Sequence, residues 1–145
     1  MAEAFSKDIF NIVKREKDRL LKISEEDAGI KPSFDKWSKK EMLGHLIDSA
    51  SNNHQRFTRA QFTDRLVFPA YDGTKWVQCQ NYINENWQHL VMFWSTYNLH
   101  LAHMISQIPP EKFFVQCKIG EANPMILEAL IAEYIRHMER HLKKI

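Results

Sequence analysis

The apolar residues of this chain recur at helical intervals within four long stretches, and this pattern limits the fold more than any other feature. The stretches are separated by the five prolines, Pro32, Pro69, Pro109, Pro110 and Pro124. The last stretch is typical, with its apolar side chains on one helical face: Leu127, Ile131, Tyr134, Ile135, Met138 and Leu142. The sequence therefore predicts an all-α protein, a four-helix bundle.

Local signals place the ends of the first two helices. The first apolar stripe runs from Phe5 to Ile23. The second helix is expected from about residue 39 to 62, because Ser38 and Glu41 form the S-x-x-E pattern of a capping box. That pattern supplies hydrogen-bond partners for backbone N–H groups that a helix start would otherwise leave free.

The second half of the chain contains the other two helices and one segment of a different kind. We expect a helical turn or two near Thr74, then the longest stripe, from Ile83 to Ile108. The fourth helix is expected to start at Pro124, a residue suited to a first helical turn. Residues 113–119 favour β structure, and we interpret them as an isolated extended connection over one end of the bundle. Connections of about 12 to 16 residues, longer than usual bundle loops, are a common place for a site.

Composition indicates an ordinary globular protein. With 145 residues, 44% of them hydrophobic, the chain is predicted to form a single domain over residues 1–145. A net charge of +2 and dispersed basic pairs, Lys39–Lys40 and Lys143–Lys144, argue for a solvated surface and against a nucleic-acid partner. No apolar run would span a membrane, and no signal peptide is recognisable. The two cysteines, Cys79 and Cys117, are expected to be reduced thiols in the cytoplasm.

Three of the seven histidines stand apart from the rest. His137 and His141 are four residues apart, so they lie on the same face of the last helix. His45 lies on the corresponding flank of the second helix, where neighbouring helices meet. An H-x-x-x-H pair alone is weak evidence for a metal, because it arises by chance in histidine-rich chains. A third histidine on a matching flank makes a metal site and a packing role about equally credible.

The other histidines have simpler interpretations. His54 lies at the edge of an apolar stripe and is expected to be a partly buried structural residue. His89, His100 and His103 fall on the outer side of the third helix and are expected to face solvent. Trp87 and Trp94 have core spacing on that helix.

A polar row continues from His45 along its flank of the second helix. It contains Ser49, Asn52 and Arg56, where a packing seam would be apolar, and such a row suits a wet pocket. Asn52 and Arg56, with Tyr134 on the last helix, are therefore candidates for contacting an anionic or amide-bearing substrate. The alternatives are a surface amide, a surface ion pair and a core tyrosine, respectively.

Longer motifs resemble a known family. The segments KWSKKEMLGHLIDSASNNHQRF (36–57), KWVQCQNY (75–82), WQHLVMFWSTYN (87–98) and EYIRHMERHLKKI (133–145) resemble the DinB/YfiT-like four-helix bundle superfamily, in the same order. The resemblance implies a divalent metal, zinc or nickel, held by His45, His137 and His141. It also implies a homodimer, and an activity among thiol-dependent S-transferases, isomerases or metal-dependent hydrolases. Glu133 stands where relatives often carry aspartate.

Three neutral imidazoles would leave at least one coordination position open, which is typical of a catalytic site. A divalent ion there could activate water, or bind a low-molecular-weight thiol as its thiolate. Asp48, the aspartate of the H-L-x-D motif, is a candidate base or a group that orients His45 or water; a solvated carboxylate is equally compatible. We therefore expect thiol transfer or hydrolysis on a small molecule. The alternative is a non-catalytic metal-binding or dimerisation bundle.

Overall fold

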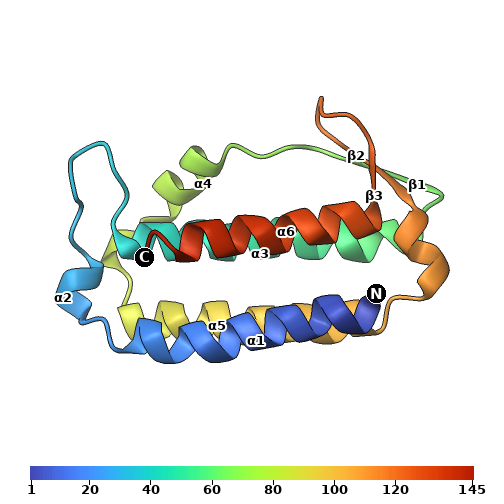
Figure 1. Cartoon of the computed structure of the whole chain (residues 1–145). Coiled ribbons are helices and arrows are strands. Elements are labelled where there is room, and N and C mark those ends of the chain that lie inside the picture. Colours follow the sequence, from blue (N-terminus) through green and yellow to red (C-terminus); the bar gives the residue numbers. More distant parts are fainter.

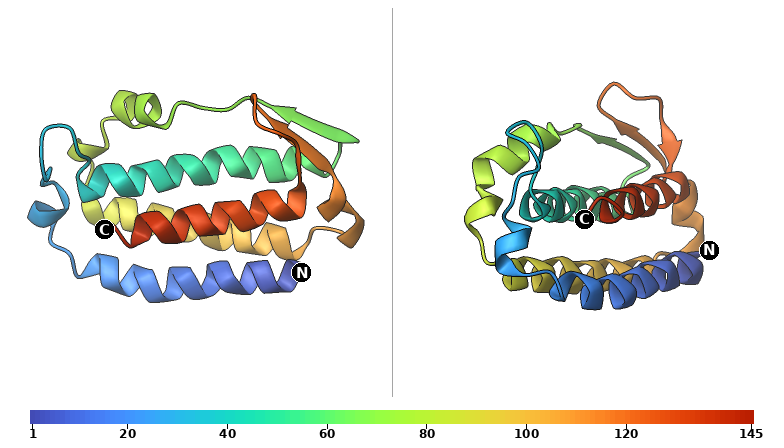
Figure 2. Two further views of the ribbon diagram at one scale, coloured as in Figure 1. Left: turned by 45° about the horizontal axis from the view of Figure 1, so that its top comes forward. Right: turned by 60° about the vertical axis from the view of Figure 1, so that its left-hand side comes forward.

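Four long helices form two layers (Figure 1). The structure is a computed structural model that describes residues 1–145. One layer contains α1 (Ala2–Leu21) and α5 (Trp87–Ser106), and the other contains α3 (Lys39–Ala60) and α6 (Leu127–Leu142). The right-hand view of Figure 2, turned towards one end of the bundle, shows both layers. The predicted all-α four-helix bundle is confirmed.

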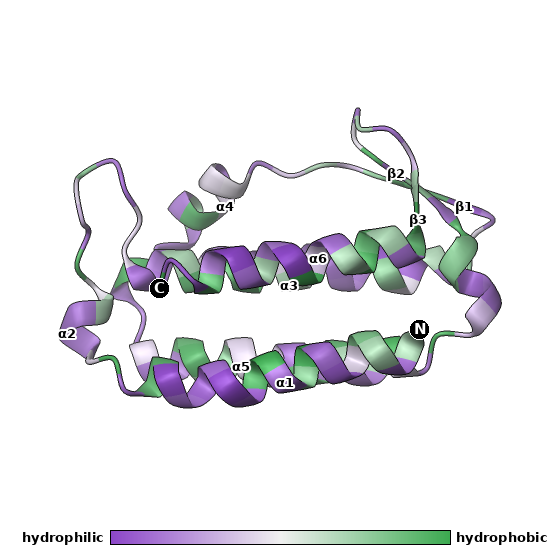
Figure 3. Cartoon of the chain, viewed as in Figure 1, coloured by the Kyte–Doolittle hydropathy of each residue, from purple (hydrophilic) through white to green (hydrophobic).

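The core lies between the two layers. In Figure 3 hydrophobic and hydrophilic residues alternate along each helix, as expected of helices with one face in the core. Trp94, Phe57, Leu20 and Ile131 come from the four long helices, and all four are completely buried. The predicted core position of Trp87 and Trp94 is confirmed. None of the helices combines the length and apolar character that crossing a bilayer requires.

The start of α3 is fixed as the sequence predicts. The Ser38 hydroxyl accepts a hydrogen bond from the Glu41 N–H at 3.2 Å, and the Glu41 carboxylate accepts one from the Ser38 N–H at 3.0 Å. This capping box determines where α3 begins, shortly before His45.

The helix directions require one long return connection. In Figure 1, α3 and α5 run in the same direction, whereas α1 and α6 run in the opposite one. The chain between α3 and α5 must therefore travel back along the bundle. Residues 61–86 do so above α3 and α6, as β1 (Arg65–Phe68), α4 (Gly73–Gln80) and the 3-10 helix η1 (Tyr82–Asn84). This connection is longer than predicted because Asn86 caps α5, so that Ile83 precedes the helix.

A small sheet at one end of the bundle was not predicted. β1 pairs in parallel with β2 (Gln116–Ile119), and β2 pairs antiparallel with β3 (Met125–Ile126). The interpretation of residues 113–119 as an isolated connection is therefore wrong. They contain the end of the 3-10 helix η2 (Pro110–Phe114) and the central strand of this sheet.

The predicted start of the last helix at Pro124 is also wrong. Met125 pairs with Cys117 and Ile126 pairs with Gln116, so their backbones are extended, and α6 begins only at Leu127. Antiparallel pairing with β2, the strand just before it in the chain, overrides the preference of proline for a first helical turn.

Lys40 is not on the solvated surface where the sequence placed it. It is only 5% exposed, and its ammonium group donates to the Glu25 carboxylate on α2 (Glu25–Ala28). The same carboxylate accepts a hydrogen bond from the Trp87 N–H at 2.7 Å. The pair therefore joins α2 to the starts of both α3 and α5.

The return connection is seated on α3 at a glycine. A Cβ atom added to Gly44 would lie 2.1 Å from Cδ2 of Tyr82, so only glycine allows this ring to approach the helix. The Tyr82 hydroxyl then donates to Asp48 Oδ1 at 2.6 Å, one helical turn further along α3. The close approach at Gly44 thus involves the chain that covers α3.

We predict that Gly44→Ala lowers the free energy of unfolding by about 1–3 kcal/mol, because the new methyl group displaces the Tyr82 ring. Gly29→Ala is the control, since its nearest contact would be 3.7 Å away and its φ is −91°. The control is expected to change stability by less than about 1 kcal/mol. Urea unfolding of both variants checks this. Equal effects would show that the contact with Tyr82 is unimportant.

Candidate metal centre

His45 on α3 and His137 and His141 on α6 come together between the two helices. One ring nitrogen from each lies within 4.8 Å of the other two. The Nε2 atoms of His45 and His137 are 3.2 Å apart, and the His141 ring centroid is 4.9 Å and 4.2 Å from those of His45 and His137. The helical flanks identified in the sequence thus face each other.

Hydrogen bonding shows which nitrogen of His141 is free to bind a ligand. His141 Nδ1 is 2.9 Å from the carbonyl oxygen of His137, which can only accept, so Nδ1 carries the proton. Its Nε2 therefore has a lone pair available. The Nδ1 atoms of His45 and His137 are buried without a hydrogen-bond partner, while their Nε2 atoms face each other. The Nε2 atoms of all three rings are thus the candidate ligands.

Two of the imidazoles are held neutral. Burial, together with repulsion from His141, lowers the pKa of His45 and His137 to about 4. Neutral imidazole is the form that binds metals. Two nitrogens on one tetrahedral zinc ion, each roughly 2.0–2.1 Å from it, lie about 3.3 Å apart. The 3.2 Å separation of His45 and His137 fits that arrangement.

Side chains and backbone from outside the two helices cover His45. The Trp37 ring centroid is 5.0 Å from that of the imidazole. At the start of α4, a Cβ atom on Gly73 would lie 3.1 Å from His45 Cε1. A glycine here lets the return connection pass close over the imidazole. Gly73 lies in a connection between the long helices, so no helical periodicity in the sequence indicated this role.

Asp48 is buried, so its interpretation as a solvated carboxylate is wrong. It is 2% exposed, and its Oδ1 accepts hydrogen bonds from the Tyr82 hydroxyl and from Gln80 Nε2 at 2.8 Å. Burial raises its pKa, and these hydrogen bonds oppose the shift. Oδ2 is buried without a partner. Asp48 forms no hydrogen bond with His45; its partners belong to the return connection, and it holds α4 and η1 in place.

A pocket of about 150 Å³ adjoins the histidines, with His137 in its wall. Arg56 and Tyr134, two of the predicted substrate contacts, also line it. Its remaining walls are Ser49, Asn53, Tyr71, Leu130 and Glu133. Asn53 and Tyr71 were missed. Asn53 lies four residues after Ser49 and three before Arg56, so its helical spacing was a usable signal, whereas Tyr71 lies in the return connection.

The three predicted substrate contacts differ in availability. Arg56 has unsatisfied hydrogen-bonding capacity, because its Nε has no partner. The Tyr134 hydroxyl donates to Asn98 Oδ1 on α5, so this residue offers the pocket its ring. Asn52 does not line the pocket, and its amide donates to the Asp48 carbonyl at 2.9 Å. The structure therefore brings Arg56 and Tyr134 to one pocket with His137, but not Asn52.

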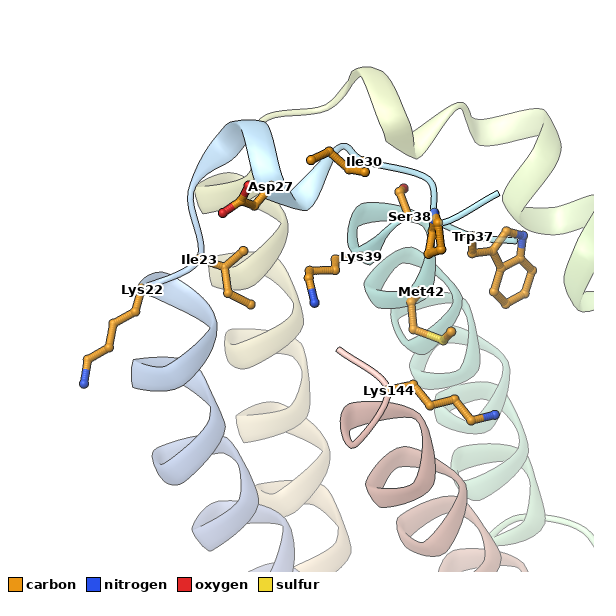
Figure 4. Close-up of a pocket in the computed structure, with 10 residues that line it drawn as sticks. Lys22, Ile23, Asp27, Ile30, Trp37, Ser38, Lys39, Met42 and Lys144 are labelled. Carbon is orange, nitrogen blue, oxygen red and sulfur yellow. The ribbon is translucent and has the colours of Figure 1, made fainter. Parts of the chain in front are cut away.

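A larger hollow of about 500 Å³ lies beyond Trp37, at the end of the bundle. Figure 4 shows Ile23, Ile30 and Met42 around it, together with three lysines. The ammonium groups of Lys22, Lys39 and Lys144 point in different directions, so they do not converge on a common anion.

The remaining histidines are placed as predicted. His54 is partly buried, and its Nδ1 is 2.9 Å from the Tyr97 hydroxyl. His89, His100 and His103 are exposed on α5. They contribute no ligand atom to the cluster.

Comparison with known proteins identifies the family. A sequence model of the DinB superfamily matches residues 15–145. The solved structure of YfiT from Bacillus subtilis, described as a probable metal-dependent hydrolase with an unusual four-helix bundle topology, has the same fold. Its TM-score is 0.83 and its sequence identity 14%, and the match covers 97% of this chain and 81% of that chain. Among curated protein sequences, none matches significantly. The chain therefore belongs to the DinB superfamily, as its motifs predicted.

Proposed function

We propose that this protein is a metal-dependent enzyme that acts on a small molecule by hydrolysis or thiol transfer. His45, His137 and His141 would hold a divalent ion, zinc or nickel. The observation that carries the proposal is the meeting of three ring nitrogens within 4.8 Å, beside a polar pocket. The description of YfiT as a probable metal-dependent hydrolase supports the hydrolytic reaction.

The ion would act as a Lewis acid, lowering the pKa of water or of a small thiol at its open position. The chain's own residues determine how well it could do so. Neutral imidazoles add no negative charge, so the ligands would leave the ion's full positive charge. Both helices are rigid supports for these side chains, and Trp37 and Gly73 restrict access to His45.

Asp48 is proposed as a positioning residue. Its carboxylate accepts hydrogen bonds from Tyr82 and Gln80, and these bonds hold α4 on α3. The position of α4 in turn places Gly73 against the His45 imidazole. A role as general base is the alternative, because its Oδ2 accepts no hydrogen bond. In the pocket, Arg56 and Tyr134 are the proposed substrate contacts. Asn52 is proposed to contribute only indirectly, through its hydrogen bond to the backbone carbonyl of Asp48.

The competing proposal is a metal-binding or dimerisation bundle without catalysis. It shares the histidine cluster, so metal binding alone does not separate the two. The homodimer, the low-molecular-weight thiol and the cytoplasmic location also stay predictions. Turnover that depends on the metal separates an enzyme from a bundle that only binds it.

We predict that the untagged wild-type protein, reconstituted with zinc or nickel, holds close to one ion per chain. Replacing both His137 and His141 with alanine should abolish this, because only one of three ligands remains. The matched control is a second pair on one helix, His100→Ala with His103→Ala, which lies on the exposed side of α5. Plasma mass spectrometry measures the metal content. Equal metal in the two double variants would contradict the site.

We predict that His45→Ala abolishes turnover while the far-ultraviolet circular dichroism stays helical. The loss should exceed the roughly 10- to 100-fold that removal of an outer hydrogen-bond partner of a metal ligand costs. Suitable substrates are panels of activated esters and amides, and electrophiles offered with a small thiol. His89→Ala is the control. Metal binding without turnover on any panel would favour the non-catalytic bundle.

We predict that Asp48→Asn retains metal and loses less than about tenfold in kcat, because the amide oxygen can still accept from Tyr82 and Gln80. Asp48→Ala should lose more, since α4 is then released from α3. Metal content and kcat of both variants check this. If the asparagine variant were as inactive as the alanine variant, with its metal intact, Asp48 would be the general base.

A further inference from the structure

Arg56 is a buried cation without an acidic partner. It is 7% exposed, and the only hydrogen bond of its side chain is a long one, from Nη1 to Asn53 Oδ1 at 3.5 Å. Its Nε is buried with no partner. The nearest support is aromatic: the guanidinium carbon lies 5.5 Å from the ring centroid of Phe68 and 5.6 Å from that of Tyr71.

The acid that shares its pocket is engaged elsewhere. Glu133 lines the same pocket, but its carboxylate pairs with Arg136 at 2.7 Å and lies 3.9 Å from Arg140. Both of these arginines are on the outer side of α6. Arg56 therefore receives no carboxylate from its own chain.

This arrangement is unfavourable unless a ligand completes it. Removing a charge from water destabilises the fold unless an opposite charge or hydrogen bonds compensate it. Burial accordingly lowers the pKa of the guanidinium, although Tyr71 offsets part of the effect. The rings of Phe68 and Tyr71 compensate only partly, because a cation–π contact is weaker than a hydrogen-bonded pair with a carboxylate. A buried arginine with free donors facing a pocket is the usual arrangement for binding an oxyanion.

The pocket connects this cation to the proposed metal centre. Arg56 and His137 are both walls of the same 150 Å³ space. Along α3, Ser49 and Arg56 are seven residues apart, or about 10 Å of helix axis. A molecule of a few carbon atoms can therefore extend from Arg56 towards the histidines.

We propose that Arg56 binds a carboxylate of the substrate, so that the substrates are small carboxylic acids whose reacting group lies at the opposite end, towards His137. The reacting end rests on the proposed function above, whereas the anchor at Arg56 does not. A planar guanidinium matches a carboxylate with two parallel hydrogen bonds. A phosphate dianion suits the pocket less well, because it would meet one free cation and the Glu133 carboxylate in a small space.

The test uses butyrate as the probe, with butyramide as its uncharged analogue and inorganic phosphate as the competing anion. Binding is followed by protein NMR titration at constant ionic strength, with metal-free and with zinc-treated protein. The variants are Arg56→Met, which keeps a long side chain against the two rings, and Arg56→Lys, which keeps the charge. Arg59→Met, exposed on the same helix, is the control.

We expect saturable binding of butyrate, but not of butyramide, to the wild type and to Arg59→Met. Arg56→Met should weaken it roughly thirtyfold or more, the loss expected on truncating one side of a buried charged pair. Arg56→Lys should weaken it less. Without ligand, Arg56→Met should unfold at the same temperature as the wild type or higher, because an unpaired buried charge has been removed.

Several outcomes would overturn the proposal. Equal binding of butyrate and butyramide, or butyrate binding that survives in Arg56→Met, would show that Arg56 is not the anchor. Stronger binding of phosphate would assign a phosphate ester instead. If Arg56→Met fails to fold, Arg56→Lys still tests the anchor, and unchanged binding there would argue against a planar pair. Butyrate binding to metal-free protein would uphold the anchor even if the protein bound no zinc.

Discussion

The directions of the helices determine most of what surrounds the histidines. Because α3 and α5 run the same way, the chain has to return over the length of the bundle, and it does so above α3 and α6 (Figure 1). The groove that carries the histidine cluster is therefore covered by residues 61–86. Gly44 is what allows this cover to lie close, since any larger residue would displace Tyr82. A short loop between antiparallel helices would have left the groove open.

The groove between α3 and α6 buries basic side chains that have no acidic partners. His45 and His137 are kept neutral by burial, and Arg56 is buried further along α3 with free donors. Core packing alone would favour apolar side chains at these positions, because neither unsatisfied imidazoles nor an unpaired guanidinium stabilise a fold. Lys40, by contrast, is buried with its carboxylate partner Glu25, and so serves structure. A buried cation that is paired, such as Lys40, thus indicates a structural role, and one that is unpaired, such as Arg56, indicates the candidate site.

The sequence predicts what depends on residues close in the chain. The capping box at Ser38 and the matching flanks of His45 and His137 follow from helical spacing, and the structure confirms the first and brings the others together. The strand at residues 116–119 was not predicted as part of a sheet, because its parallel partner, β1 (Arg65–Phe68), lies far away in sequence. Pro124 misled for a different reason, because the residues that follow it pair with β2, the strand just before them in the chain. Gly73 and Tyr71 were missed because their neighbours across the groove leave no periodic signal.

The two sources of the site's residues imply a division of roles. The candidate ligands come from α3 and α6, whose mutual position is fixed by the core, so few substitutions there would be tolerated. Tyr71, over Arg56, and Gly73, over His45, come from the return connection, which is held on α3 by other residues, Tyr82 and Gln80. Connections of this kind accept changes in length and sequence more readily than packed helices. The metal centre would then stay constant while the shape of the pocket changes, and with it the length of molecule that fits between the histidines and Arg56.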